Sequence, residues 1–138
     1  MIRQRPVELL APARNVECAM AAVDHGADAV YIGASRFGAR ASAGNSVEDI
    51  ARVVEYAHTF RVKVYVTVNT ILKDEELPET EKLVWALYRA GVDALIVQDL
   101  AVARLAKQVV PSLALHGSTQ MSVHSLAGAQ LLRDLGFS

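Results

Sequence analysis

The sequence has little cysteine, few aromatic residues and no excess of charge of either sign. Its 138 residues include one cysteine, Cys18, which excludes an intramolecular disulfide and a zinc site built on several cysteines. Aromatic residues make up 6% of the chain, and the formal net charge is −1. A basic surface for nucleic acid is therefore not indicated within this chain. The single thiol predicts a reducing, cytoplasmic compartment.

Long apolar runs are also missing. The first six residues contain no apolar segment of the kind found in signal peptides. Formal charges are absent between Lys107 and Arg133, but Gln, Ser, His, Gly and Pro interrupt this stretch. The sequence therefore predicts no membrane span.

One phrase occurs twice: a helix-like stretch, then Gly-x-Asp-Ala, then a short apolar run. The copies are GADAVYI at residues 26–32 and GVDALIV at residues 91–97. Glycine at such a position is typical of a helix end, because it adopts the left-handed conformation without a Cβ clash. A short run of branched apolar residues is typical of a strand buried on both faces of a parallel sheet. The chain is therefore predicted to consist of βα units.

The predicted strands cover residues 7–11, 29–33, 63–69, 94–98 and 113–116. Helices are expected to begin at the caps Asn15 and Ser46, the second with a capping box to Asp49, and to cover residues 79–90 and 100–110. A fifth helix is expected to end near Gly136. The connection over residues 34–45 is longer than usual for a βα loop, which favours a functional role.

These units define an α/β fold with two candidate architectures. One is the first five βα units of a truncated (β/α)8 TIM-type barrel, and the alternative is a flavodoxin-like doubly wound sheet. A doubly wound nucleotide-binding fold would have a glycine-rich turn after its first strand, whereas residues 11–14 are Ala-Pro-Ala-Arg. A helix end at Gly136 with no strand after it also favours the incomplete barrel.

Polar side chains at strand ends are the candidate site residues, because the loops at these ends carry the chemistry of βα folds. Asn69, Gln98 and His116 end predicted strands, Gln120 follows in the next loop, and Glu8 lies inside the first predicted strand. We expect His116, Asn69 and Glu8 to be catalytic, and Gln98 and Gln120 to bind substrate. The alternative is a ring of mutually hydrogen-bonded groups.

Three further residues are candidates for substrate binding. Arg36 and Arg40 lie in the long connection, and a guanidinium pairs bidentately with a carboxylate or a phosphate. Ser118 follows His116 by two residues, without the Gly-x-Ser-x-Gly elbow of serine hydrolases. Cys18 is expected to be a small buried apolar residue. No histidine spacing indicates a metal site.

Six blocks, in this order, resemble peptidase family U32, and within it the branch of 23S rRNA 5-hydroxycytidine synthases. The blocks are ELLAPA at 8–13, GADAVYIG at 26–33, FGAR at 37–40, VTVNT at 66–70, DALIVQD at 93–99 and HGSTQ at 116–120.

The resemblance implies that residues 1–138 are the N-terminal portion of a (β/α)8-type catalytic domain. It further implies an intact enzyme that hydroxylates an RNA base with prephenate as co-substrate, and an iron–sulfur cluster whose cysteines lie downstream. This chain alone is then expected to be inactive. The alternatives are a collagenase-like peptidase, a tRNA uridine hydroxylase, and a non-catalytic module that binds a partner. Expected partners are RNA and a small-molecule carboxylate, and open sheet edges are expected to cause self-association.

Overall fold

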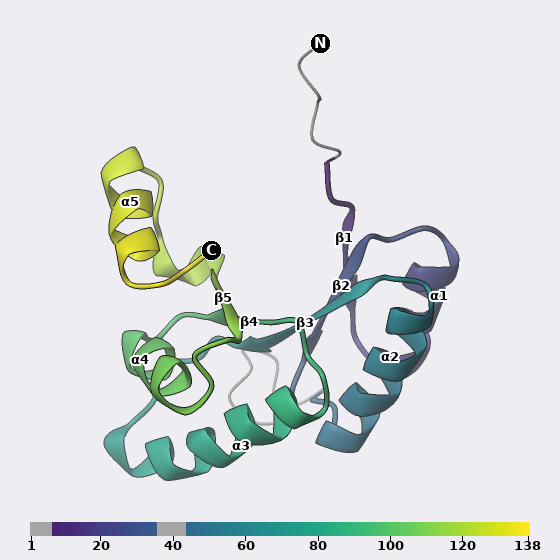
Figure 1. Cartoon of the computed structure of the whole chain (residues 1–138), viewed down its shortest axis with the longest axis horizontal. Helices are drawn as coiled ribbons and strands as arrows, with labels where there is room; N and C mark the ends of the chain where they lie inside the picture. The colour runs from purple at the N-terminus through teal and green to yellow at the C-terminus, as the bar shows by residue number, and fades with distance from the viewer. Residues whose placement is uncertain (1–6, 36–43) are drawn as a thin grey trace.

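A computed structural model describes residues 7–35 and 44–138 of the chain. Helices and strands alternate along it, and Figure 1 shows the helices around the outside of a curved sheet. The elements are β1 (Leu10–Ala13), α1 (Val16–Asp24), β2 (Ala29–Gly33), α2 (Val47–Thr59), β3 (Lys63–Val68), the short 3-10 helix η2 (Asp74–Glu76), α3 (Leu77–Arg89), β4 (Ala94–Val97), α4 (Leu100–Val109), β5 (Ala114–Gly117), the 3-10 helix η3 (Thr119–Met121) and α5 (Leu126–Asp134).

The repeated glycines end helices as predicted. Gly26, Gly91 and Gly136 have φ angles of +91°, +86° and +94°, just beyond α1, α3 and α5. A residue with a Cβ is strained at these angles, so glycine turns the chain from each helix at the least cost. The caps of α1 and α2 are also as predicted, because Asn15 accepts a hydrogen bond from the Cys18 N–H and Ser46 forms its capping box with Asp49.

The aspartates of the repeated phrase fix the starts of strands. Asp28 Oδ2 accepts the Leu9 N–H at 2.7 Å, and the Asp28 N–H donates to the Leu9 carbonyl at 2.9 Å. Asp93 makes the same pair with Val64, with its Oδ2 accepting at 2.8 Å and its N–H donating at 2.9 Å. Each carboxylate therefore satisfies a backbone group that the ladder leaves open on the neighbouring strand.

Two predicted elements begin at least two residues away from the predicted position, and the boundaries of the other elements agree to within about one residue. The first strand covers Leu10–Ala13 rather than residues 7–11, because Leu9 is engaged by Asp28 and the ladder begins at the next residue. Glu8 therefore precedes the strand instead of lying inside it. Helix α3 begins at Leu77 rather than near residue 79, since Pro78 occupies its first turn, where a missing N–H costs nothing.

Sheet order decides between the two predicted architectures. The order is β1-β2-β3-β4-β5, and every neighbouring pair is parallel. A flavodoxin-like sheet has the order 2-1-3-4-5, so this alternative was wrong. The chain forms five successive βα units arranged as in a (β/α)8 barrel.

The two faces of the sheet have different neighbours. Branched side chains such as Val30, Ile32, Val66 and Leu95 are fully buried in the main core, which also contains residues from α1 to α4. Alternate residues point to the opposite, concave face, where Ala29, Tyr65 and Ala94 form a second, small cluster, with Tyr31, Ile96 and Ala114 packed against it. Because side chains alternate between the two faces along each strand, the polar residues of the strand ends are expected on one face.

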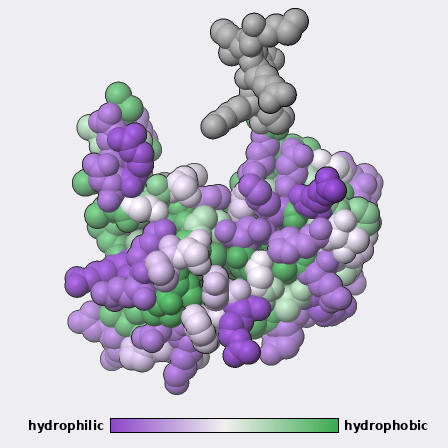
Figure 2. Space-filling model, in the orientation of Figure 1, coloured by the Kyte–Doolittle hydropathy of each residue, from purple (hydrophilic) through white to green (hydrophobic). Residues whose placement is uncertain are grey.

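Hydrophobic side chains remain exposed near the C-terminus. Helix α5 has no buried residue, and its Leu126 and Leu131 are 75% and 60% exposed. Figure 1 shows α5 standing away from the other helices, and Figure 2 shows hydrophobic surface at its free tip. None of the helices in the described ranges combines the length and apolarity that crossing a bilayer requires.

Replacing Asp93 with alanine is expected to lower the free energy of unfolding by about 1–3 kcal/mol, since the Val64 N–H loses its acceptor. Urea unfolding followed by circular dichroism measures this change. Asp134→Ala is the matched control, because that carboxylate is 70% exposed. Equal stability of the two variants would contradict the role assigned to Asp93.

The isolated chain is expected to self-associate. Strands β1 and β5 are the outer strands of the described sheet, and unpaired strand edges recruit further strands. The exposed leucines of α5 add to this tendency. Size-exclusion chromatography with light scattering measures the mass of the particle. A monodisperse monomer over a hundredfold range of concentration would contradict this prediction.

Candidate functional site

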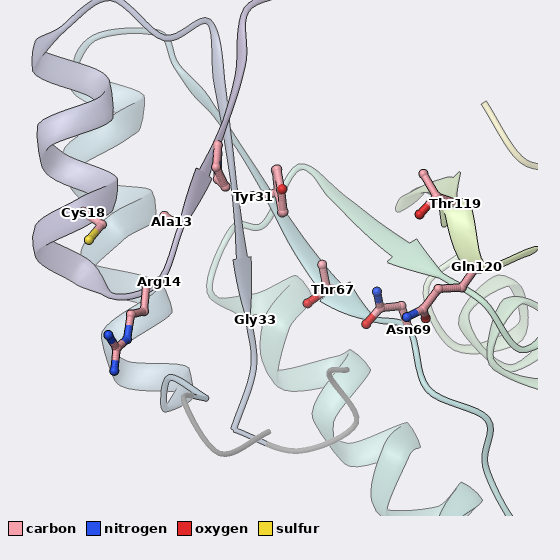
Figure 3. A pocket seen from close by; sticks show the side chains of 10 residues that line it. Ala13, Arg14, Cys18, Tyr31, Gly33, Thr67, Asn69, Thr119 and Gln120 are labelled. Carbon is pink, nitrogen blue, oxygen red and sulfur yellow. The ribbon is translucent and has the colours of Figure 1, made fainter. Parts of the chain in front are cut away.

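A cavity of about 660 Å³ lies where the carboxyl ends of β1, β2 and β3 meet the turn after β5. Polar side chains on its wall come from five elements or their ends, and Figure 3 shows Arg14 and Cys18 on one side and Asn69 and Gln120 on the other. They include Arg14, Cys18, Tyr31, Thr67, Asn69 and Gln120. The size is that of a small-molecule site.

Buried Asn45 joins the ends of β1 and β2 beside this cavity. Its side chain is 7% exposed, and Nδ2 donates to the Arg14 carbonyl at 3.1 Å and to the Gly33 carbonyl at 3.0 Å. The Asn45 N–H also donates to the Gly33 carbonyl, and the Ser35 N–H donates to the Asn45 carbonyl. One residue therefore holds both strand ends in place, and it does so where the long connection returns to the sheet.

Glycine is required next to this asparagine. A Cβ on Gly44 would overlap the Cα of Ser35, so no other residue can be placed there without moving the backbone. A β-bridge between Ala34 and Asn45 also holds the two ends of the connection side by side. Arg36 and Arg40, which were predicted to bind substrate, lie within this connection and outside the described residues.

Cys18 does not occupy the predicted position. It was expected to be buried, but its side chain is exposed and lies on the cavity wall. The reason is its place in the first turn of α1, immediately after the end of β1, where the helix faces the cavity rather than the core. Ala19, the next residue, is the fully buried one.

The three predicted amide residues, Asn69, Gln98 and Gln120, are divided between two neighbouring cavities. Asn69 and Gln120 line the same cavity, and Gln120 also borders a second cavity of about 440 Å³ that includes Gln98. Asp99 lies in this second cavity as well, where Oδ1 caps α4 through the Ala101 N–H and Oδ2 accepts the Leu72 N–H at 3.0 Å. It thereby ties the loop after β3 to the start of α4.

Ser118 has a structural contact. It is 7% exposed, and its Oγ accepts the Gln120 N–H at 3.2 Å, which caps η3. Within the described residues no histidine contacts this hydroxyl. A nucleophilic serine needs a base within hydrogen-bond reach, so the geometry does not favour Ser118 as a nucleophile.

Glu8 and His116 meet through a third residue, Tyr65. The Tyr65 hydroxyl donates to both carboxylate oxygens of Glu8, at 3.1 and 2.9 Å, and its ring packs edge-on against His116 with 4.7 Å between centroids. We name these three residues the tyrosine cluster. It does not line the cavity of about 660 Å³, so the predicted catalytic residues divide into Asn69 on its wall and Glu8 and His116 elsewhere.

Burial governs the protonation of the tyrosine cluster. It lowers the pKa of His116, which the Glu8 carboxylate partly restores and the Lys63 ammonium lowers further. Burial and the hydrogen bond to Glu8 both raise the pKa of Tyr65. At neutral pH the cluster is therefore a neutral imidazole beside a protonated phenol.

His58 and His25 have structural contacts. His58 Nε2 lies 2.8 Å from Asp93 Oδ2, and His25 Nδ1 lies 2.7 Å from the Ala21 carbonyl. In the described residues, no group of three or more His, Cys, Asp or Glu side chains could hold a metal ion.

Several residues of the site were not predicted. Arg14 follows the first strand, so the strand-end rule that selected Asn69 also applies to it once β1 is placed at Leu10–Ala13. Tyr65 lies in the middle of β3, so the strand-end rule did not select it, although the alternation with Val64 and Val66 places it on the face opposite the main core. Asn45 was assigned only to a loop, and its two carbonyl contacts depend on tertiary structure.

Comparisons with known proteins identify relatives. Residues 14–138 match the sequence profile of peptidase family U32. The chain is 48% identical to a 23S rRNA 5-hydroxycytidine synthase of Escherichia coli (strain K12), covering 96% of this chain and 20% of that protein. It is 38% identical to tRNA hydroxylation protein P1 of Bacillus subtilis (strain 168), covering 99% and 32%.

The fold has a solved counterpart. A structure of a U32 peptidase superposes with a TM-score of 0.72 at 13% identity, covering 97% of this chain and 58% of that one. At this identity the likeness concerns the fold alone. The chain spans about a fifth to a third of the length of the two curated relatives.

The pKa of His116 is expected to lie below the usual value of about 6.5. Glu8→Gln is expected to lower it further, since a stabilising negative charge is lost, and Lys63→Gln is expected to raise it. Titration of the imidazole by NMR measures all three values. Shifts of the same sign in both variants would contradict the assigned electrostatics.

His116 is also expected to make folding depend on pH. Because its pKa is lower in the folded chain, the unfolded chain binds more protons below about pH 6.5, so stability falls as the pH falls through this range. Unfolding in urea at pH 7.5 and at pH 5.0 measures this loss. His116→Gln should lose less stability over the same interval, and an equal or larger loss would refute the assignment.

Proposed function

The chain belongs to peptidase family U32, and from that membership we propose that it forms the N-terminal part of the catalytic barrel of a cytoplasmic RNA hydroxylase. The observation that carries the proposal is a small-molecule cavity at the carboxyl ends of parallel strands, in a chain 48% identical to an rRNA 5-hydroxycytidine synthase. Active sites of (β/α)8 enzymes are built at this end of the strands.

The proposed reaction is the formation of 5-hydroxycytidine in 23S rRNA. Identity to the rRNA synthase is 48%, against 38% to tRNA hydroxylation protein P1, so the rRNA base is favoured over a tRNA uridine. The RNA would bind mainly to parts of the protein beyond this chain, since the net charge here is −1.

Prephenate is proposed as the co-substrate, on the family resemblance. It carries two carboxylates, and arginine binds carboxylates bidentately. Arg36 and Arg40 are proposed to take part in this binding. Asn69 and Gln120 on the cavity wall and Gln98 in the second cavity are proposed to contact the neutral polar groups of the substrates, with Ser118 hydrogen-bonded to the backbone of Gln120.

The tyrosine cluster is proposed to hold and move protons. His116 is half-buried and neutral at physiological pH, so it can accept a proton, while the Glu8 carboxylate accepts a hydrogen bond from Tyr65 and favours the protonated imidazole.

An iron–sulfur cluster does not fit this chain. Such clusters are held by several cysteine thiolates, and the chain has Cys18 alone, exposed in α1. Ligands for a cluster would have to come from sequence outside these 138 residues.

Two alternatives remain distinct. Peptidase activity is supported by the family name, but the capping role of Ser118 and the absence of a histidine beside it in the described residues speak against a serine nucleophile. A non-catalytic module would bind a partner through the exposed leucines of α5.

Nucleoside mass spectrometry of 23S rRNA tests the proposal. The host lacks its own 5-hydroxycytidine synthase and receives either the full-length gene, extended past Ser138, or these 138 residues alone. We expect hydroxycytidine with the full-length gene only, because the chain spans 20% of the related synthase.

A matched pair of variants refines the test. Asn69→Ala in the full-length gene is expected to lower hydroxycytidine at least tenfold, because the residue lines the cavity, whereas Gln108→Ala, an exposed amide of α4, is expected to leave it unchanged. If both variants keep full modification, Asn69 does not belong to the site. Hydroxylated uridine in tRNA, with unmodified rRNA, would assign the protein to the tRNA branch.

A further inference from the structure

The described wall of the cavity at the ends of β1, β2 and β3 carries formal charge of one sign only, which is positive. Among the described residues on its wall, Arg14 carries a formal charge, and none is an aspartate or a glutamate. The remaining polar atoms are hydroxyl groups, amides and the Cys18 thiol. A wall whose described residues carry one cation and no carboxylate favours an anion, since none of these residues neutralises the guanidinium.

The Arg14 guanidinium has no partner among the residues that the structure describes. Within residues 7–35 and 44–138, no carboxylate forms an ion pair with its guanidinium and no side-chain hydrogen bond engages it. A guanidinium offers five N–H donors in a fixed plane, which match the two oxygens of a carboxylate. Its donors are therefore available to a ligand in the cavity.

Asn45 holds the backbone of Arg14 in place. Asn45 Nδ2 donates to the Arg14 carbonyl and to the Gly33 carbonyl on the neighbouring strand, and the asparagine is 7% exposed. Both Nδ2 protons are thus used to set where β1 ends and where the arginine leaves the sheet. Asn45 does not line the cavity, so its effect on a ligand would act through Arg14.

We propose that Arg14 is an anion-binding residue of a site for a small organic carboxylate in this cavity, and that Asn45 is its positioning residue. Thr67 and Asn69, on the wall formed by β3, would hydrogen-bond a hydroxyl or carbonyl group of the same molecule. The inference rests on the proposed function only in its choice of prephenate as the probe.

A small carboxylate fits the cavity better than an RNA phosphate. A volume of about 660 Å³ encloses a small molecule. Binding of a phosphodiester backbone relies on several cations that release counterions together, whereas the described wall has one.

Cys18 provides a direct readout, because it is the one cysteine in the chain and is exposed on the cavity wall. The rate of its alkylation by iodoacetamide, a neutral reagent, is measured with increasing prephenate, inorganic phosphate or cytidine 5′-monophosphate. We expect prephenate to slow alkylation at least fivefold at saturation, and the two phosphates to have no effect at the same concentrations.

Four variants test which residues are responsible for the protection of Cys18 by prephenate. Arg14→Gln and Asn45→Asp are each expected to raise the prephenate concentration for half-protection about tenfold or more, the first by removing the charge and the second by removing both Nδ2 donors. Arg14→Lys is expected to lie between the wild type and Arg14→Gln, since the charge remains and the planar fork is lost. Arg104→Gln, with the same charge change on an exposed face of α4, should match the wild type.

Each variant is compared with its own ligand-free rate, and circular dichroism checks its fold. Three results would overturn the proposal: no protection by prephenate, equal protection by a phosphate, or protection that Arg14→Gln leaves intact while the fold is retained. Hydroxylation plays no part in this measurement. Protection of Cys18 without any modified RNA in the complementation experiment would therefore support the site and refute the proposed function. Modified RNA without protection of Cys18 would support the proposed function and refute the site.

Discussion

Each strand from β2 to β5 pairs in parallel with the strand that precedes it in the chain. This constraint brings all five carboxyl ends to one edge, so that residues as distant in sequence as Arg14 and Gln120 line one cavity. It depends on side chains at both ends of the strands. Asp28 and Asp93 satisfy backbone groups where strands begin, and Asn45 joins two strands where they end. The short strands thus rely on buried branched side chains for stability and on these polar contacts for register.

The curved sheet separates two kinds of chemistry. On its concave side, the tyrosine cluster combines a buried phenol, a half-buried imidazole and an exposed carboxylate, and burial keeps the pKa of the imidazole below its usual value. The cavity at the strand ends contains a guanidinium and no carboxylate among its described residues, so it favours an anion. A substrate bound in the cavity and a proton acceptor below it would be held on the same rigid strands, which gives more precise positions than loops do.

Much of the fold could be predicted from the sequence, because local signals determine it. Gly26 and Gly91 mark helix ends through their backbone conformation, and Asn15 and Ser46 mark helix starts through their side chains. The first strand was misplaced because the interaction that sets its start, between Leu9 and Asp28, joins residues 19 apart. For the same reason the strand-end rule found Asn69 but missed Arg14, and it did not select Tyr65 because that residue lies in the middle of β3. Contacts between distant residues decide these positions, and a single sequence does not display them.

A crystal structure of the full-length protein with prephenate would test the central claim, that this chain is part of a barrel with its substrate cavity at the strand ends. The account predicts a further parallel strand paired with β5, and ligand density between the Arg14 guanidinium and the Asn69 side chain. A β5 edge without a strand partner, or a cavity filled by side chains while the ligand binds elsewhere, would contradict it.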